Sequence, residues 1–138
     1  MTFYLIFLPK IETSNIIFID DQQNVLLVKR ADKNDFGNLW SLSGGTLQEG
    51  ETKEDAIVRE IKEELGCELS SFHFFRSYNF VVNENSIVAN YFFGMINGLI
   101  KLDANELSEY KWFKKSEVPN DLAFNQNIIL MDYWKSSE

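Results

Sequence analysis

The sequence predicts an α/β fold: a sandwich in which helices cover a mixed β-sheet. Short runs rich in β-branched and aromatic residues recur along most of the chain. Apolar residues follow a helical pattern over residues 52–65, and a second segment that suits a helix spans 125–134. Strands therefore outnumber helices, and the two helices are available to cover the sheet. We expect residues 1–138 to form a single domain, because this length suits one core and no linker interrupts it.

The first half of the chain is expected to begin with a β-hairpin. Residues 16–20 and 25–29 are apolar and β-branched, and the Asp-Gln-Gln-Asn sequence between them favours a turn. A loop rich in Asp and Asn follows over 31–38. We then expect a strand at 39–42 and a short extended segment at 45–47.

Residues 52–65 are predicted to form an amphipathic helix. Ile57, Ile61 and Leu65 recur every four residues, so they share one face. Gly66 stands directly after them, where a helix commonly ends on a glycine. The helix is therefore expected to pack this stripe against the sheet.

The second half of the chain predicts a longer hairpin and a closing helix. Residues 72–82 and 87–96 are rich in strand formers and flank the polar residues 83–86. A further short strand is expected at 110–113. The apolar residues of 125–134 are compatible with a helix that packs on the sheet.

The charge of the chain argues against a general affinity for nucleic acid polymers. The formal net charge is -8, and only Arg30, Arg59 and Arg76 carry guanidinium groups. Binding to polyanions depends largely on Lys and Arg that neutralise phosphates. An acidic protein that handles phosphates needs another source of positive charge, and a bound divalent cation supplies one.

The remaining composition predicts an untargeted cytoplasmic protein. Cys67 is the only cysteine, so no intrachain disulfide can form, which suits a reducing compartment. No stretch approaches the roughly 18 apolar residues of a membrane span, and the start of the chain has no basic leader. We expect no membrane association.

Three glutamates share one face of the predicted helix. Glu60 and Glu64 lie about 40° apart on a helical wheel, and Glu63 lies about 60° to the other side of Glu60. Like charges at such spacings cost roughly 0.2–0.5 kcal/mol per pair. A divalent cation would relieve this repulsion, since Mg²⁺ prefers oxygen ligands. Taken alone, however, an acidic helix face is more often a solvated surface.

The spacing around these glutamates favours the metal site over the solvated surface. Five residues separate Gly45 from Glu51, seven more lead to residue 59, and residues 59–67 read REIKEELGC. This pattern resembles the Nudix box, Gx5Ex7REUxEExGU with U apolar, at every fixed position. The resemblance implies an α/β/α sandwich with a loop-helix-loop catalytic element.

The resemblance also implies a cofactor and its ligands. Nudix enzymes use Mg²⁺ or Mn²⁺ to cut a diphosphate linkage. By position in the box, Glu60 and Glu64 are expected as the principal metal ligands, and Glu63 as a ligand directly or through water. The Gly44 carbonyl is a further candidate oxygen ligand, because the double glycine lets the backbone approach an ion closely.

Two other roles are expected around the metal. Arg59 is expected to orient Glu51 or one of the clustered carboxylates as a bidentate donor, although a simple surface ion pair is the alternative. Family members differ in which carboxylate acts as the base. The base lies either in the box, at Glu63 or Glu64, or outside it, where Glu106 and Glu109 are candidates; Glu109 is our choice of these two.

The substrate is expected to stack on aromatic side chains, and Phe36, Trp40 and Phe124 are candidates that can equally belong to the core. Asn125 is expected to read a base edge, unless it caps the last helix. Arg30 is expected to face the substrate's phosphates, unless it is only a solvated strand end.

Our functional hypothesis is hydrolysis of a nucleoside triphosphate or a nucleoside-diphosphate-linked small molecule, of the 8-oxo-dGTP or ADP-ribose type. A catalytically silent sensor of such ligands on the same fold is the alternative. A metal-dependent isomerase is disfavoured, because Cys67 occupies an apolar position of the box. A homodimer is possible, since family members often dimerise, although no sequence feature marks an interface.

Overall fold

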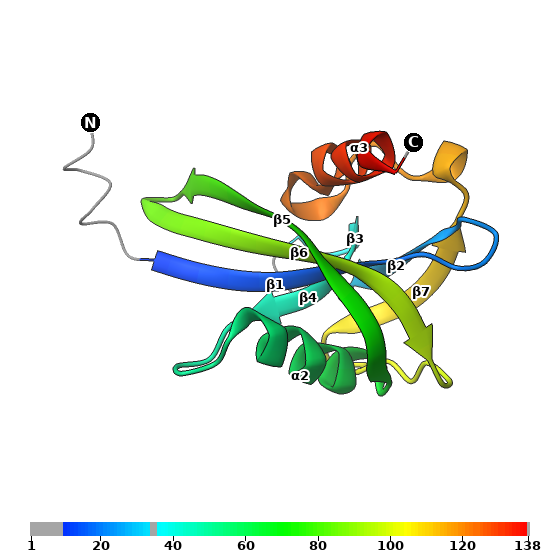
Figure 1. Ribbon diagram of the computed structural model, residues 1–138, viewed down its shortest axis with the longest axis horizontal. Coiled ribbons are helices and arrows are strands. Elements are labelled where there is room, and N and C mark those ends of the chain that lie inside the picture. The colour runs from blue at the N-terminus through cyan, green and yellow to red at the C-terminus, as the bar shows by residue number, and fades with distance from the viewer. Residues whose placement is uncertain (1–9, 34–35, 138) are drawn as a thin grey trace.

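The computed structural model describes residues 10–33 and 36–137, and in these residues the strands form two sheets with a helix on either side (Figure 1). The four-stranded sheet has the order β4 (Ser43–Thr46), β1 (Lys10–Phe18), β6 (Asn85–Asn97) and β5 (Glu68–Val82). The three-stranded sheet has the order β3 (Trp40–Ser41), β2 (Val25–Arg30) and β7 (Leu107–Phe113). The helical segments are α2 (Lys53–Leu65), α3 (Gln126–Ser136) and the short turns η1 (Lys115–Glu117) and η2 (Ala123–Asn125).

The predicted α/β sandwich with a mixed sheet is confirmed. β1 runs parallel to β6, whereas its pairing with β4 is antiparallel. Successive side chains of β1 point to opposite faces: Ile16 and Phe18 pack toward α2, and Ile17 packs in the cluster that contains α3. The two sheets therefore form the middle layer between α2 and α3 (Figure 1).

The helix predicted over residues 52–65 is confirmed almost to the residue. The Thr52 hydroxyl accepts a hydrogen bond of 3.0 Å from the Asp55 N–H, which satisfies an otherwise unpaired donor at the start of α2. Gly66 ends the helix in the left-handed conformation, with φ 67°. Both caps follow from the residue types that the sequence provides at these two positions.

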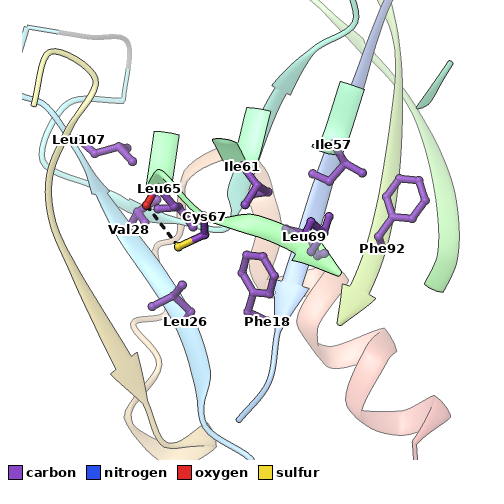
Figure 2. Close-up of a cluster of buried hydrophobic side chains, with 11 residues drawn as sticks. Phe18, Leu26, Val28, Ile57, Ile61, Leu65, Cys67, Leu69, Phe92 and Leu107 are labelled. Carbon is purple, nitrogen blue, oxygen red and sulfur yellow. Dashed lines mark hydrogen bonds between the residues drawn. The ribbon is translucent and has the colours of Figure 1, made fainter. Parts of the chain in front are cut away.

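The buried face of α2 packs into a core built from both sheets. Ile57, Ile61 and Leu65 are fully buried and contact a cluster that includes Phe18 and Phe92 (Figure 2). Because the apolar stripe of α2 is held in this way, the opposite, acidic face of the helix is directed away from the core.

The hairpin predicted from residues 16–20 and 25–29 is wrong, although both segments are strands. Ile19 and Val25 form only an isolated bridge, and β1 pairs instead with β4 and β6. Asp20 does close the expected turn, since its carboxylate accepts from the N–H groups of Gln22 and Asn24. β1 is buried on both faces, which suits a central strand with a partner on each side, so the chain leaves its sheet at this turn.

The hairpin predicted around residues 83–86 is confirmed. Asn83 and Glu84 connect β5 to β6 with φ values of 50° and 64°, the positive angles that a two-residue turn of this kind requires. The predicted strand at 110–113 begins earlier, at Leu107, and the closing helix begins at Gln126. None of the helices in the described residues is long and apolar enough to cross a membrane.

Replacing Ile61 by Ala tests the packing of α2. We expect the free energy of unfolding to fall by about 2–5 kcal/mol, because the change leaves a cavity in the core shown in Figure 2. Val58→Ala is the matched control, since Val58 lies on the same helix with 36% of its surface exposed. The control should change stability by no more than about 0.5 kcal/mol in urea denaturation. Equal losses for both variants would contradict the assigned buried face.

Candidate active site

A pocket of about 450 Å³ opens between the acidic face of α2, the start of β4 and the loop before β7. It is lined by the double glycine, Arg59 and the three clustered glutamates, together with Arg30, Asp103 and Glu106. The structure thus brings together all of the residues expected at the metal, namely Gly44, Glu60, Glu63 and Glu64.

The two glycines allow β4 to approach its neighbours more closely than a side chain permits. A Cβ at position 44 would lie 2.2 Å from the backbone oxygen of Ser14. A Cβ at position 45 would lie 2.4 Å from the Glu60 carboxyl carbon. The absence of side chains at Gly44 and Gly45 therefore lets the backbone and the Glu60 carboxylate line the same pocket.

Arg59 binds several of the carboxylates at once. Its Nε and Nη2 donate to the two oxygens of Glu51, at 2.7 and 2.9 Å, in the bidentate geometry that guanidinium groups favour. Its Nη1 donates to Glu60 at 2.9 Å and to Glu63 at 3.2 Å. The two hydrogen bonds from Arg59 to Glu51, together with one from the Gln48 N–H, lower the pKa of Glu51 to about 2. Arg59 thus holds a network in place and is more than an isolated surface ion pair.

Glu64 is the most buried of the clustered glutamates, with 7% of its surface exposed. Its carboxylate accepts a hydrogen bond of 3.1 Å from the Gly44 N–H. Burial, and next the negative charge of Glu60, raise the pKa of Glu64 to about 8. Burial also raises the pKa of Glu60, although Arg59 opposes that shift. The pocket therefore concentrates negative charge that a proton or a cation would neutralise.

The oxygen donors of this pocket fit a hard divalent cation. Among residues 10–33 and 36–137, no three His, Cys, Asp or Glu side chains form a complete metal-binding group by themselves. Glu60 and Glu63 both accept a hydrogen bond from Nη1 of Arg59. Mg²⁺ commonly takes one or two carboxylates and completes its shell with water and substrate phosphates. Glu60 and Glu64, which line the pocket with Gly44, could supply such carboxylates.

Three of the four expected substrate residues meet beside this pocket. The ring centres of Phe36 and Phe124 lie 4.5 Å apart. Phe36 has 47% of its surface exposed, and Phe124 has 45%. The guanidinium carbon of Arg30 lies 5.6 Å from the centre of the Phe124 ring, and Arg30 also lines the pocket. We call Phe36 and Phe124 the aromatic platform, because they present ring surface at the side of the pocket that Arg30 lines.

The remaining residues that the sequence analysis singled out do not all lie at the pocket. Asn125 is exposed at the start of α3, and its side chain makes no capping hydrogen bond, so the capping alternative is wrong. Trp40 packs edge-on against Phe113 with ring centres 5.0 Å apart, in agreement with the alternative of a core role. Glu109, on β7, lies outside the pocket lining, and its Oε2 is 3.9 Å from Nζ of Lys29. Glu106, in contrast, lines the pocket.

Asp103 is a pocket residue that the sequence analysis did not single out. Its N–H donates to the Glu64 backbone oxygen at 2.9 Å, and the Lys101 N–H donates to that of Leu65 at 2.8 Å. These bonds attach the segment before β7 to the end of α2. No spacing rule connects residues 103 and 64, so the sequence carried no signal of this contact.

Comparison with known proteins points to one family. The NUDIX domain profile matches residues 10–133. The chain is 32% identical to an ADP-ribose pyrophosphatase from Methanocaldococcus jannaschii, covering 93% of this chain and 76% of the relative. It is 31% identical to a putative 8-oxo-dGTP diphosphatase from Bacillus subtilis, covering 86% and 76%. It is 28% identical to the NAD-capped RNA hydrolase NudC from Vibrio vulnificus, covering 80% of this chain but only 41% of that protein.

Solved structures with the same fold include a MutT NUDIX hydrolase from Burkholderia pseudomallei. The TM-score is 0.79 at 24% identity, covering 88% of this chain and 96% of the other. The NUDIX domain of Shewanella oneidensis NrtR, solved with ADP ribose, has a TM-score of 0.76 at 20% identity, covering 95% and 89%. At 24% and 20% sequence identity, the similarity to these two structures shows the fold alone.

Replacing Gly45 by Ala tests whether the close approach of β4 serves the ion site. The new Cβ would displace the Glu60 carboxylate, which is the end of a flexible side chain, so we expect the free energy of unfolding to change by no more than about 1 kcal/mol. Calorimetric titration should show Mg²⁺ affinity at least about tenfold lower than in the wild type.

Thr46→Ala is the control, because Thr46 is an exposed neighbour on β4 that contacts Arg59 through its backbone oxygen only. Its affinity for Mg²⁺ should match that of the wild type. Unchanged affinity in Gly45→Ala would argue against Glu60 as a ligand.

Proposed function

Because this chain belongs to the Nudix hydrolase family, we propose that it hydrolyses a diphosphate bond in a nucleoside triphosphate or a nucleoside-diphosphate-linked small molecule, with Mg²⁺ or Mn²⁺ as cofactor. One observation carries the proposal: Glu60, Glu64 and the double glycine line one pocket with Arg30, next to the aromatic platform. Groups that suit a cation, a phosphate and a base are therefore adjacent.

Glu60, Glu64 and the Gly44 carbonyl would hold the cation, and Glu63 would contact it directly or through a water molecule. When bound, the cation supplies neutralisation of charge on the phosphate oxygens and lowers the pKa of the attacking water. Arg59 orients Glu60 and Glu63 for this role, because one of its nitrogens donates to both.

The reaction joins a water oxygen to phosphorus and breaks the bond from that phosphorus to the bridging oxygen of the diphosphate. A carboxylate must accept the proton that the water loses. Glu63, Glu64 and Glu109 remain our candidates for this base. Glu106 is a further candidate outside the box, supported by its place in the pocket lining, whereas Glu109 would first have to leave Lys29.

Arg30 supports the assignment of the phosphate subsite. It lines the pocket, and among residues 10–33 and 36–137 its buried Nε has no hydrogen-bond partner. A buried guanidinium nitrogen without a partner costs free energy, and a substrate phosphate would satisfy it. Stacking of a nucleobase on Phe124 would extend the substrate from this phosphate toward the exposed Asn125.

The relatives support a purine nucleotide as the substrate class, since an ADP-ribose pyrophosphatase and a putative 8-oxo-dGTP diphosphatase are both about 30% identical. A panel of 8-oxo-dGTP, ADP-ribose and NAD-capped RNA, with detection of the monophosphate product, separates the options. A silent nucleotide sensor would bind one of these in calorimetry without cleaving it. The intact network of Arg59 and its carboxylates argues against that alternative.

Replacing Glu64 by Gln tests the metal site directly. We expect kcat to fall by roughly 10²-fold or more, because the change removes one charged ligand from a preorganised site. Glu49→Gln is the control, since Glu49 is an exposed residue outside the pocket, and it should retain wild-type activity. Full activity in Glu64→Gln would refute the assignment.

Replacing Phe124 by Ala tests the aromatic platform. Loss of base stacking should raise KM for the nucleotide roughly tenfold, a magnitude that stacking on one ring can supply. Met131→Ala is the control, because Met131 is similarly exposed on α3 but lies outside the platform. Equal KM values in the two variants would place the base elsewhere.

A further inference from the structure

We propose that Gln126, a residue outside the Nudix motif, is a positioning residue that holds the double glycine in place for catalysis. This inference deepens the proposed function and rests on it. Gln126 is the first residue of α3, and 1% of its surface is exposed. A buried amide requires hydrogen-bond partners, so the identity of those partners indicates what the residue does.

The first partner of Gln126 is the backbone at the junction between the two sheets. Leu42 lies between β3, which belongs to the three-stranded sheet, and β4, which belongs to the four-stranded sheet. It is the residue at which the chain changes sheets, so its buried N–H lies outside both ladders. The side-chain oxygen of Gln126 accepts this N–H at 2.7 Å. The amide thereby satisfies a donor that the sheets leave without a partner.

The second partner ties Gln126 to the strand row that contains Gly44. Its side-chain nitrogen donates to the Tyr91 hydroxyl at 3.3 Å. Tyr91 lies opposite Asn15 in the parallel ladder, and Asn15 lies opposite Gly44 in the antiparallel one. One amide therefore binds both the chain two residues before Gly44 and a residue two strands away in the row in which Gly44 lies.

The position of Gly44 matters because it contacts the metal site. Its N–H donates to the Glu64 carboxylate at 3.1 Å, and its carbonyl is a proposed ligand of the cation. If the Leu42 N–H lost its acceptor, the buried strand junction would have to move or admit water to satisfy it. The Gly44 backbone would then no longer be fixed relative to Glu64.

Gln126 also connects this junction to the aromatic platform. It follows directly on Phe124 and Asn125, which adopt the left-handed conformation with φ values of 59° and 56°. The same buried amide that anchors the start of α3 thus fixes the backbone that carries Phe124. A change at Gln126 is expected to affect the metal side and the base side of the pocket together.

Hydrogen exchange of single amides in the metal-free protein tests the proposal without any substrate. In Gln126→Met, which keeps the length of the side chain but removes the amide, we expect the Leu42 and Gly44 amides to exchange at least about tenfold faster. Gln126→Glu keeps an acceptor for Leu42, so it should restore a large part of the protection. If Gln126→Met fails to fold, Gln126→Asn, which withdraws the amide by one methylene, replaces it.

Tyr78→Phe is the matched control. It removes the 2.8 Å hydrogen bond from the Tyr78 hydroxyl to Asp132 and so weakens another attachment of α3 to the sheet. We expect it to lower stability while the Gly44 amide keeps its wild-type protection. Unchanged protection of Leu42 and Gly44 in Gln126→Met, or the same change in Tyr78→Phe, would overturn the proposal.

Kinetics provide a second readout. Gln126→Met should lower kcat at least about tenfold and raise the Mg²⁺ concentration for half-maximal activity, whereas Tyr78→Phe should change neither. A loss of stability without these changes would assign Gln126 a purely structural role. If the wild type cleaves no diphosphate, the proposed function fails, yet the exchange experiment still decides whether Gln126 holds the double glycine.

Discussion

The structure of the pocket depends on the repulsion among carboxylates gathered on one face of α2 and on the single guanidinium that offsets it. Arg59 donates to Glu51, Glu60 and Glu63, whereas the carboxylate of Glu64 accepts from the Gly44 N–H. Burial and the charge of Glu60 raise the pKa of Glu64 to about 8, so a negative charge on Glu64 is unfavourable there. A bound cation would therefore stabilise the site, because added positive charge lowers the cost of ionising Glu64 beside Glu60.

The fold enforces this repulsion by fixing α2 from its opposite face. Ile57, Ile61 and Leu65 are fully buried, so the helix cannot rotate to expose Glu60 and Glu64 to bulk water without losing that packing. Burial of these three side chains contributes several kcal/mol in total, at roughly 1.5–3 kcal/mol each. Carboxylate repulsion of a few tenths of a kcal/mol per pair cannot overcome it. Core packing thus supplies the energy that holds an electrostatically unfavourable site together.

Sequence reasoning succeeded where the determining residues are close along the chain. The caps of α2, the turn at Asn83 and the grouping of the acidic residues all follow from local spacing. It failed where a partner lies far away: β1 pairs with β6, more than seventy residues later, and no local pattern distinguishes that partner from the adjacent β2. The roles of Asp103 and Gln126 were invisible for the same reason, since both depend on long-range hydrogen bonds to the backbone.

The charge distribution also constrains how substrate and cation bind. The net charge is -8, and the three guanidinium nitrogens of Arg59 all donate to protein oxygens, so a phosphate entering the pocket would meet Arg30 together with the clustered glutamates. Without a cation, these glutamates would repel the phosphate; with the proposed cation, the same glutamates would anchor the ion that attracts it. Each ligand would then favour the other, and by linkage the increase in substrate affinity caused by the proposed cation would equal the increase in cation affinity caused by substrate. An acidic protein can bind a polyphosphate in this way because the attraction is confined to the site that holds the ion.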